Sequence, residues 1–219
     1  NPMAITKPGT YTITQKDMGS RYVLIIIRTQ VNMQDEKDMA AVSELQDKIK
    51  IEQKDKGSYE VTNKWDMEEI MAMRYKYIDL ANEKNLSPND MFGKKGKLSQ
   101  ESHNCGVAYG WGGFTSDQAV YINYISAKDS PATLTLKDVP IADNAFWSVT
   151  VYDKGGYVQE APYNINSAFA TYNEDGSATI HFGGENTSAP NYLAIFPGWT
   201  CILRIYLPQE EYFSKKWVE

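Results

Sequence analysis

The sequence predicts a mainly β protein with a helical segment, in which antiparallel strands form a sandwich or a closed barrel. Three observations support this fold class. From residue 119 onward, short strands with alternating apolar and polar residues are separated by turn residues. Residues 35–49 and 65–85 instead repeat apolar residues at helical spacing. With 42% hydrophobic and 12% aromatic residues over 219 positions, the chain can build a substantial core.

The clearest strand and turn lie between Asp143 and Gly156, in the run DNAFWSVTVYDKGG. Residues of this run alternate between an apolar face that begins at Trp147 and a more polar face that ends at Tyr152. This period of two is typical of a half-buried antiparallel strand. The turn at residues 153–156 then reverses the chain.

Further strands follow the same pattern through the C-terminal half. We expect them at residues 119–126, 132–138, 145–153, 177–183 and 200–207. Turn residues separate them, at positions 129–131, 154–156, 174–176 and 197–198. Short strands at this spacing are typical of a sandwich or a closed barrel and argue against a parallel sheet.

The N-terminal 31 residues are expected to contain two strands, Thr10–Thr14 and Arg21–Val31, joined by a turn at residues 16–19. The second strand contains Tyr22–Ile27, which is apolar without alternation and therefore predicts a strand buried on both faces. Such a strand needs neighbours. We expect it to pack on the C-terminal sheet or on residues that precede Asn1 in a longer polypeptide.

Helices are expected in the middle of the chain. From Asp35 onward apolar residues recur at intervals of three and four, which predicts an amphipathic helix. A charged linker at residues 52–64 follows, and a second helix begins near Trp65 and ends before Asn85. Residues 99–109 can form a third, short helix.

Net charge, residue counts and the motifs present limit the partners that the chain can bind and the reactions that it can catalyse. A net charge of −6 and a pI of about 5.1 argue against nucleic acid, which requires a cationic surface. No apolar run reaches the roughly 18 to 20 residues that span a bilayer. The cysteines, Cys105 and Cys201, allow either one disulfide or two buried free thiols. Only two histidines are present, and no zinc-binding or catalytic-triad motif occurs, so neither a metal nor a cofactor is expected.

Four side chains are candidate ligand-binding residues. His181 lies on a polar strand face, where it can act as an acid or base or be an exposed histidine without a role. Arg204 lies in mid-strand and must reach water, a ligand or a carboxylate such as Asp138, Asp143 or Asp153. Trp111 lies between glycines and is the tryptophan most open to stacking on a sugar, ahead of Trp147 and Trp199. Tyr152 completes the set on the polar face of its strand.

Several longer motifs resemble a bacterial family. The C-terminal half resembles the DUF1214 domain in the runs GWGGFTSDQAVYINY, LTLKDVPIADNAFWSVTVYDKGGYV, YNEDGSATIHFGG, NYLAIFPGWTCILRIYLP and KKW. The upstream run GSRYVLIIIRTQVNMQDEKDMAAVSELQDKIKI resembles the end of a DUF1254 domain, most of which is absent. The resemblance covers roughly residues 20–50 and 107–219. It implies a jelly-roll-like sandwich or barrel and a periplasmic or secreted setting. The loop at residues 163–171 is shorter than is usual in the family.

Together these observations divide the chain into a DUF1254-like part (1–55), a helical and Gly-rich connector (56–113) and a DUF1214-like β-sandwich (114–219). The first functional hypothesis is a ligand-binding or assembly module, a sandwich capped by two or three helices. It would bind a small molecule or glycan, a second copy of the chain, or an N-terminal DUF1254 portion. The alternatives are a hydrolase acting on a glycan or glycoconjugate, with Asp143 or Asp153 near Arg204, and the C-terminal half of a larger protein without separate activity. Whether the chain is an enzyme stays open.

Overall fold

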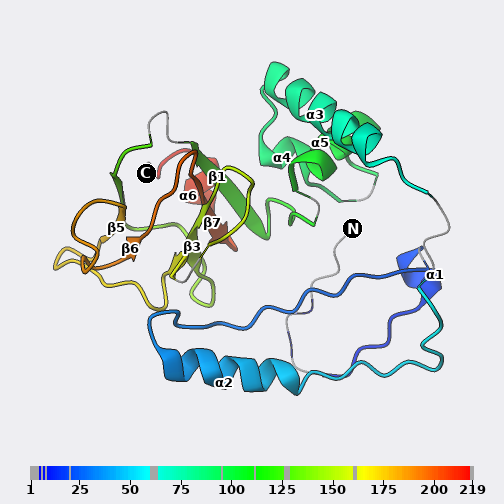
Figure 1. Cartoon of the computed structure of the whole chain (residues 1–219), viewed down its shortest axis with the longest axis horizontal. Helices are drawn as coiled ribbons and strands as arrows, with labels where there is room; N and C mark the ends of the chain where they lie inside the picture. Colours follow the sequence, from blue (N-terminus) through cyan, green and yellow to red (C-terminus); the bar gives the residue numbers. More distant parts are fainter. Residues whose placement is uncertain are drawn as a thin grey trace. The chain divides into compact units, whose positions relative to one another are not determined.

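The computed structural model describes residues 5, 7, 9–19, 21–59, 64–94, 96–110, 112–125, 129–159 and 162–217 (Figure 1). The chain forms two compact units, residues 2–57 and residues 58–219. None of the helices in these ranges is both long enough and apolar enough to cross a membrane.

The described residues of the N-terminal unit form two helices. The predicted helix after Asp35 is confirmed as α2, Glu36–Asp47, and the Asp35 carboxylate caps it by accepting the backbone N–H of Lys37 at 2.9 Å. The predicted turn near residue 16 is a single helical turn, α1 (Gln15–Met18). It ends at Gly19, whose φ of 67° lies in the left-handed region that glycine adopts without strain.

The strands predicted in this unit are not formed. Residues 10–14 and 21–31 belong to no strand in the described part of the chain. The side chains of Tyr22–Ile27 are 41–64% exposed, so the prediction of a strand buried on both faces is wrong. An apolar run indicates that a segment can be buried, but it does not supply the neighbouring strands that burial requires.

The second unit begins with three helices. They are α3 (Met67–Glu83), α4 (Pro88–Met91) and α5 (Gln100–Gly110), and α3 and α4 each pack on α5. Their shared core buries Met91 and Cys105. Gly106 allows α5 to approach α4 closely, because a Cβ atom at this position would lie 2.6 Å from the Met91 carbonyl oxygen. The predicted helices near residues 65–85 and 99–109 are confirmed, and α4 was not predicted.

The β part consists of two sheets. The first has the order β1-β7-β3-β4 and is antiparallel throughout. The second has the order β2-β5-β6, with β2 and β5 antiparallel but β5 and β6 parallel. The strands are β1 (Ala119–Ile125), β2 (Ala132–Leu136), β3 (Trp147–Tyr152), β4 (Asn164–Asn166), β5 (Ala178–Phe182), β6 (Tyr192–Leu193) and β7 (Thr200–Tyr206). A last short helix, α6, spans Glu210–Phe213.

The five strands predicted in this half are all present. The prediction did not find β4 and β6, which have three and two residues and are too short to show a period. Because β6 runs parallel to β5, the second sheet is mixed rather than purely antiparallel. The described strands form two open sheets, so the closed-barrel alternative is wrong. Of the three helices at residues 67–110, α4 contacts the edge strand β1.

One core joins the two sheets. It takes the buried faces of β3 and β7 together with side chains from β5 and β6. Leu203 and Ile205 on β7 are 0% exposed and Cys201 is 1% exposed, as expected of a strand in which apolar and polar residues alternate. Cys105 and Cys201 are both free and buried, as the second alternative for the cysteines expected.

Candidate functional site

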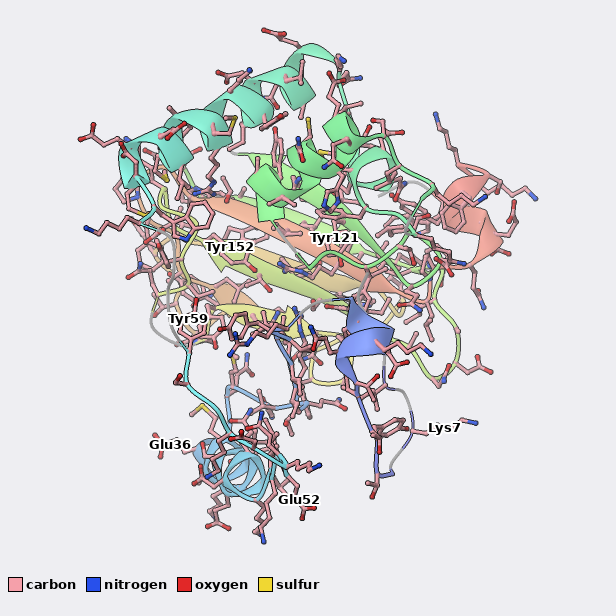
Figure 2. All side chains as sticks on the ribbon, turned by 90° about the vertical axis from the view of Figure 1, so that its right-hand side faces the viewer. Lys7, Glu36, Glu52, Tyr59, Tyr121 and Tyr152 are labelled. Atoms are coloured by element: carbon pink, nitrogen blue, oxygen red, sulfur yellow. The ribbon has the colours of Figure 1, made fainter. Side chains whose placement is uncertain are left out.

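The opposite face of the four-stranded sheet carries polar and aromatic side chains. Strand register places two complete rows of residues across β1, β7, β3 and β4 on this face. We call these two rows, with Tyr152 at the end of β3, the polar face. The rows are Tyr121, Arg204, Ser148, Asn166 and Asn123, Ile202, Thr150, Asn164. Strand register places Tyr121 and Tyr152, which are labelled in Figure 2, on the same side of the sheet.

Arg204 and Tyr152 meet over the centre of the polar face. The Arg204 Nη2 donates to the Tyr152 hydroxyl oxygen at 2.7 Å, and the guanidinium carbon lies 5.6 Å from the centre of the phenol ring. Arg204 is in register with Ser148, which is four residues, or about 13 Å, from Tyr152 along β3. Both side chains must therefore lean along the strands across Thr150. This explains why Ser148 and Thr150 are only 6% and 7% exposed.

Neighbouring side chains fix the borders of the polar face. The Asn164 amide donates to the Val149 carbonyl oxygen at 3.1 Å and to the Thr150 hydroxyl at 2.8 Å. On the β1 side, the Tyr121 hydroxyl accepts the backbone N–H of Phe114 at 2.9 Å. The sheet therefore holds these polar side chains in set positions before any ligand binds.

Arg204 has no carboxylate partner within the described ranges. The ion pairs found there join Lys84 to Glu101, Lys94 to Asp117 and Lys137 to Asp175. Of the three predicted carboxylate partners, Asp153 instead closes its own turn. Hydrogen bonds from the Tyr157 and Gly155 backbone N–H groups hold the pKa of Asp153 below its usual range. A phenol, rather than Asp138, Asp143 or Asp153, is the hydrogen-bonding partner of the guanidinium.

The other predicted candidates lie elsewhere. His181 is on the exposed face of the second sheet, opposite Thr133 and beside Tyr192, so the shared core separates it from Arg204. Trp111 lies outside the described residues. Trp147 and Trp199 are each 3% exposed and belong to the core, so they offer no stacking surface. The structure thus brings together two of the four candidates, Tyr152 and Arg204.

Reactive groups in the described ranges are held in structural positions. Burial raises the pKa of the Cys201 thiol to about 12, and burial also raises the pKa of the Cys105 thiol. Both thiols therefore stay protonated at neutral pH and are poor nucleophiles. In the same ranges, no three or more His, Cys, Asp or Glu side chains gather in a way that could hold a metal ion.

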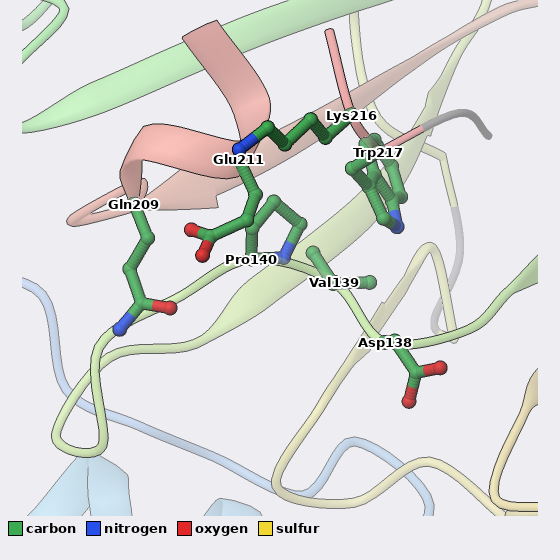
Figure 3. A pocket seen from close by; sticks show the side chains of 7 residues that line it. All are labelled: Asp138, Val139, Pro140, Gln209, Glu211, Lys216 and Trp217. Carbon is green, nitrogen blue, oxygen red and sulfur yellow. The ribbon is translucent and has the colours of Figure 1, made fainter. Parts of the chain in front are cut away.

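A concave region apart from the polar face was not predicted from the sequence. It has a volume of about 390 Å³ and lies between the loop that follows β2 and the C-terminal residues (Figure 3). Its lining residues are Asp138, Val139, Pro140, Gln209, Glu211, Lys216 and Trp217. The Trp217 indole N–H donates to the Lys137 carbonyl oxygen at 2.8 Å, which fixes the ring against this loop. The sequence signal for this region is Trp217, which directly follows the charged pair Lys215 and Lys216.

Comparison with known proteins supports the C-terminal part of the predicted resemblance. Residues 123–210 match the family model described as "Protein of unknown function (DUF1214)". The DUF1254 part of the resemblance stays a prediction. A search of curated proteins finds no match to this chain.

Two solved structures are similar to the chain. The VPA0106 protein from Vibrio parahaemolyticus matches with 14% identity and a TM-score of 0.50 over 94% of this chain and 59% of its own. An uncharacterized protein from Burkholderia cenocepacia matches with 19% identity and a TM-score of 0.35 over 42% of this chain and 27% of its own. The chain therefore spans about 59% of the length of the first protein, with which it shares a fold. Neither description names an activity.

Proposed function

We propose that the chain is a non-catalytic ligand-binding module and that the polar face is its binding surface. One observation carries this proposal. Arg204 is a half-buried cation whose hydrogen-bonding partner in the described structure is the Tyr152 phenol, so its charge is not neutralised by a carboxylate. A partly buried guanidinium that keeps free donors is a ready site for a polar ligand.

The arrangement of the surrounding groups supports binding rather than catalysis. A hydrolase acting on a glycan requires two carboxylates about 5 to 10 Å apart at the scissile bond. Asp153, one of the two carboxylates that the hydrolase alternative places near Arg204, accepts three hydrogen bonds within its own turn segment. His181 lies on the exposed face of the other sheet. Asp153 and His181 are therefore not held as a catalytic pair on the polar face.

The side chains of the polar face suit a small molecule or a glycan. Tyr121 and Tyr152 contribute aromatic rings to the polar face; the Tyr152 ring packs against the Arg204 guanidinium and the Tyr121 ring lies 6.0 Å from the Phe92 ring. Asn123, Asn164 and Asn166 add amide donors and acceptors in the same two rows. The combination of rings and amides is typical of surfaces that fix a polyhydroxylated or heteroaromatic ligand.

A thermal-shift screen against sugars, small organic acids, nucleotides and lipids tests this function. A ligand that binds only the native state stabilises it by about 2.7 kcal/mol at a hundredfold excess over its dissociation constant. We expect at least one compound to raise the melting temperature of the wild type and of His181→Ala, but not of Arg204→Ala or Tyr152→Ala. If the melting temperature also rises in Arg204→Ala and Tyr152→Ala, the ligand does not bind at the polar face. The absence of any shift would refute small-ligand binding at ordinary affinity.

A second candidate function, docking to another protein subunit, is favoured by the N-terminal unit. Val23–Ile27 form a continuous apolar run whose side chains are 41–64% exposed. Contiguous exposed apolar residues are typical of protein interaction surfaces. Light scattering after size-exclusion chromatography tests this, with Leu24→Lys and Ile26→Lys compared with the wild type. Assembly through this segment predicts a wild-type oligomer and smaller particles for both variants, whereas equal masses would contradict it.

A further inference from the structure

We propose that the ligand of the polar face carries a carboxylate, and that this carboxylate binds the Arg204 guanidinium and the Tyr152 hydroxyl together. The inference rests on the proposed function, because it names the class of ligand for the same surface. It adds the chemical group that is recognised and the two side chains that recognise it.

The direction of the hydrogen bond between the two side chains supports this assignment. A guanidinium has only donors, so in the 2.7 Å contact the Tyr152 oxygen is the acceptor. The phenol proton must then point to a different acceptor, and in the described structure the Tyr152 hydroxyl donates to no protein group. Arg204 likewise keeps the donors that the Tyr152 contact does not use. Two neighbouring groups thus present N–H and O–H donors side by side.

The layer beneath the pair adds another donor. The Thr150 hydroxyl accepts a hydrogen bond from the Asn164 amide at 2.8 Å, so its own proton is available to a further acceptor. Thr150 lies between Arg204 and Tyr152 along the strands. Arg204, Tyr152 and Thr150 therefore all present donors at the centre of the polar face, and a ligand that pairs with these three groups must supply acceptor oxygens.

Charge selects a carboxylate among such ligands. Arg204 is the only charged side chain in the two rows of the polar face. A single positive charge is balanced by a monoanion, whereas a phosphate dianion would leave one negative charge uncompensated. A carboxylate is also planar and presents two oxygens, which match the fork of guanidinium donors. A monovalent, planar anion is therefore the complementary group.

NMR of the arginine side chains tests this inference directly. The chain has four arginines, Arg21, Arg28, Arg74 and Arg204, so its Nε–Hε spectrum is simple. Arg204→Lys identifies the signal of interest by its disappearance. The probes are two matched pairs, benzoate with benzamide and glucuronate with glucose, together with inorganic phosphate. Titration to about 10 mM detects dissociation constants in the millimolar range.

We expect the Arg204 signal to move with the two carboxylates and to stay in place with benzamide and glucose. The signal of Arg74, whose Nε donates to the Ala108 carbonyl oxygen, serves as an internal control. Tyr152→Phe keeps the ring beneath the guanidinium but removes the hydroxyl, so it should weaken carboxylate binding about tenfold. Tyr192→Phe on the other sheet should leave the affinity unchanged.

Several results would overturn the inference. If the amide and glucose probes, or phosphate, shift the Arg204 signal as strongly as the carboxylates, the ligand class is wrong although binding at the polar face stands. If carboxylate affinity is unchanged in Tyr152→Phe, the two side chains do not act together. If no carboxylate moves the Arg204 signal, the inference fails, and the thermal-shift screen then decides separately whether the polar face binds a neutral ligand.

Discussion

Replacing Leu203 by alanine tests the architecture on which the polar face depends. Leu203 lies in the middle of β7 and is 0% exposed. Its strand neighbours in register are Ile122 on β1 and Val149 on β3, and Val149 is also 0% exposed. The adjacent residue, Ile202, points to the polar face and is half-buried, so Ile202→Ala removes a comparable aliphatic side chain from the other side of the same strand.

The two substitutions should differ severalfold in free energy of unfolding. Truncation of a fully buried leucine removes three carbons and leaves a cavity that the surrounding residues fill only in part, which costs about 3 to 5 kcal/mol. Ile202 loses a smaller buried area and leaves a gap that is open to water. We expect Ile202→Ala to cost about 1 kcal/mol.

Urea unfolding followed by tryptophan fluorescence measures this difference. Trp147 and Trp199 lie in the same core as Leu203, so their emission reports on the two sheets. Equal slopes of the free energy of unfolding against urea concentration would show that both variants expose the same amount of surface when they unfold. If Leu203→Ala cost no more than Ile202→Ala, β7 would not divide an apolar core from a polar face, and the site built on that division would be wrong.

Two further predictions concern pH dependence and helix packing. Hydrogen bonds from Ser177, with the neighbouring Lys137, lower the pKa of Asp175 from 3.8 to about 2. A carboxyl whose pKa is lower in the folded state than in the unfolded state contributes stability above its unfolded pKa, and this contribution is lost as the pH falls through the folded pKa. We therefore expect the free energy of unfolding to fall between about pH 4 and pH 2, and to fall less steeply in Asp175→Asn. Acid titration monitored by circular dichroism checks this, and parallel curves would contradict it. In α5, Gly106→Ala should lower the melting temperature because its new Cβ meets a backbone carbonyl at 2.6 Å, whereas Gly110→Ala, with nothing within 4 Å, should not. Equal melting temperatures would show that α5 does not approach α4 so closely.

The strand faces could be predicted because their signal is local. Alternation along β3 and β7 places Tyr152 and Arg204 on the polar side. In the structure β7 alternates between buried and half-buried residues, whereas residues 147–151 of β3 are buried on both faces, so the expectation of a half-buried strand there is wrong. The starts of the helices could be predicted for the same reason. Asp35 and Asp66 cap the helices that follow them by accepting backbone N–H groups only two residues away. In each case the residues that decide the outcome are close neighbours in the chain.

The partners of these elements could not be predicted in the same way. The apolar run at residues 22–27 indicates what the segment can bury, but whether a neighbour covers it depends on residues far along the chain or outside it. The short strands β4 and β6 exist because β3 and β5 provide hydrogen-bonding edges for them. With only three and two residues, β4 and β6 are too short to show an alternation of apolar and polar residues in the sequence.

From the sequence alone, it was possible to determine the order of α3, α5 and the five longer strands in the second unit, the apolar face of β3 and β7, and Arg204 as a cation that needs a partner. Tertiary structure decided which partner it has. Arg204 and Tyr152 are 52 positions apart, and Trp217 and Lys137, which border the concave region, are 80 positions apart. The direction of a hydrogen bond and the balance of charge depend on which groups are neighbours in the folded chain. They can therefore be determined only when strand pairing has brought residues from distant parts of the sequence together.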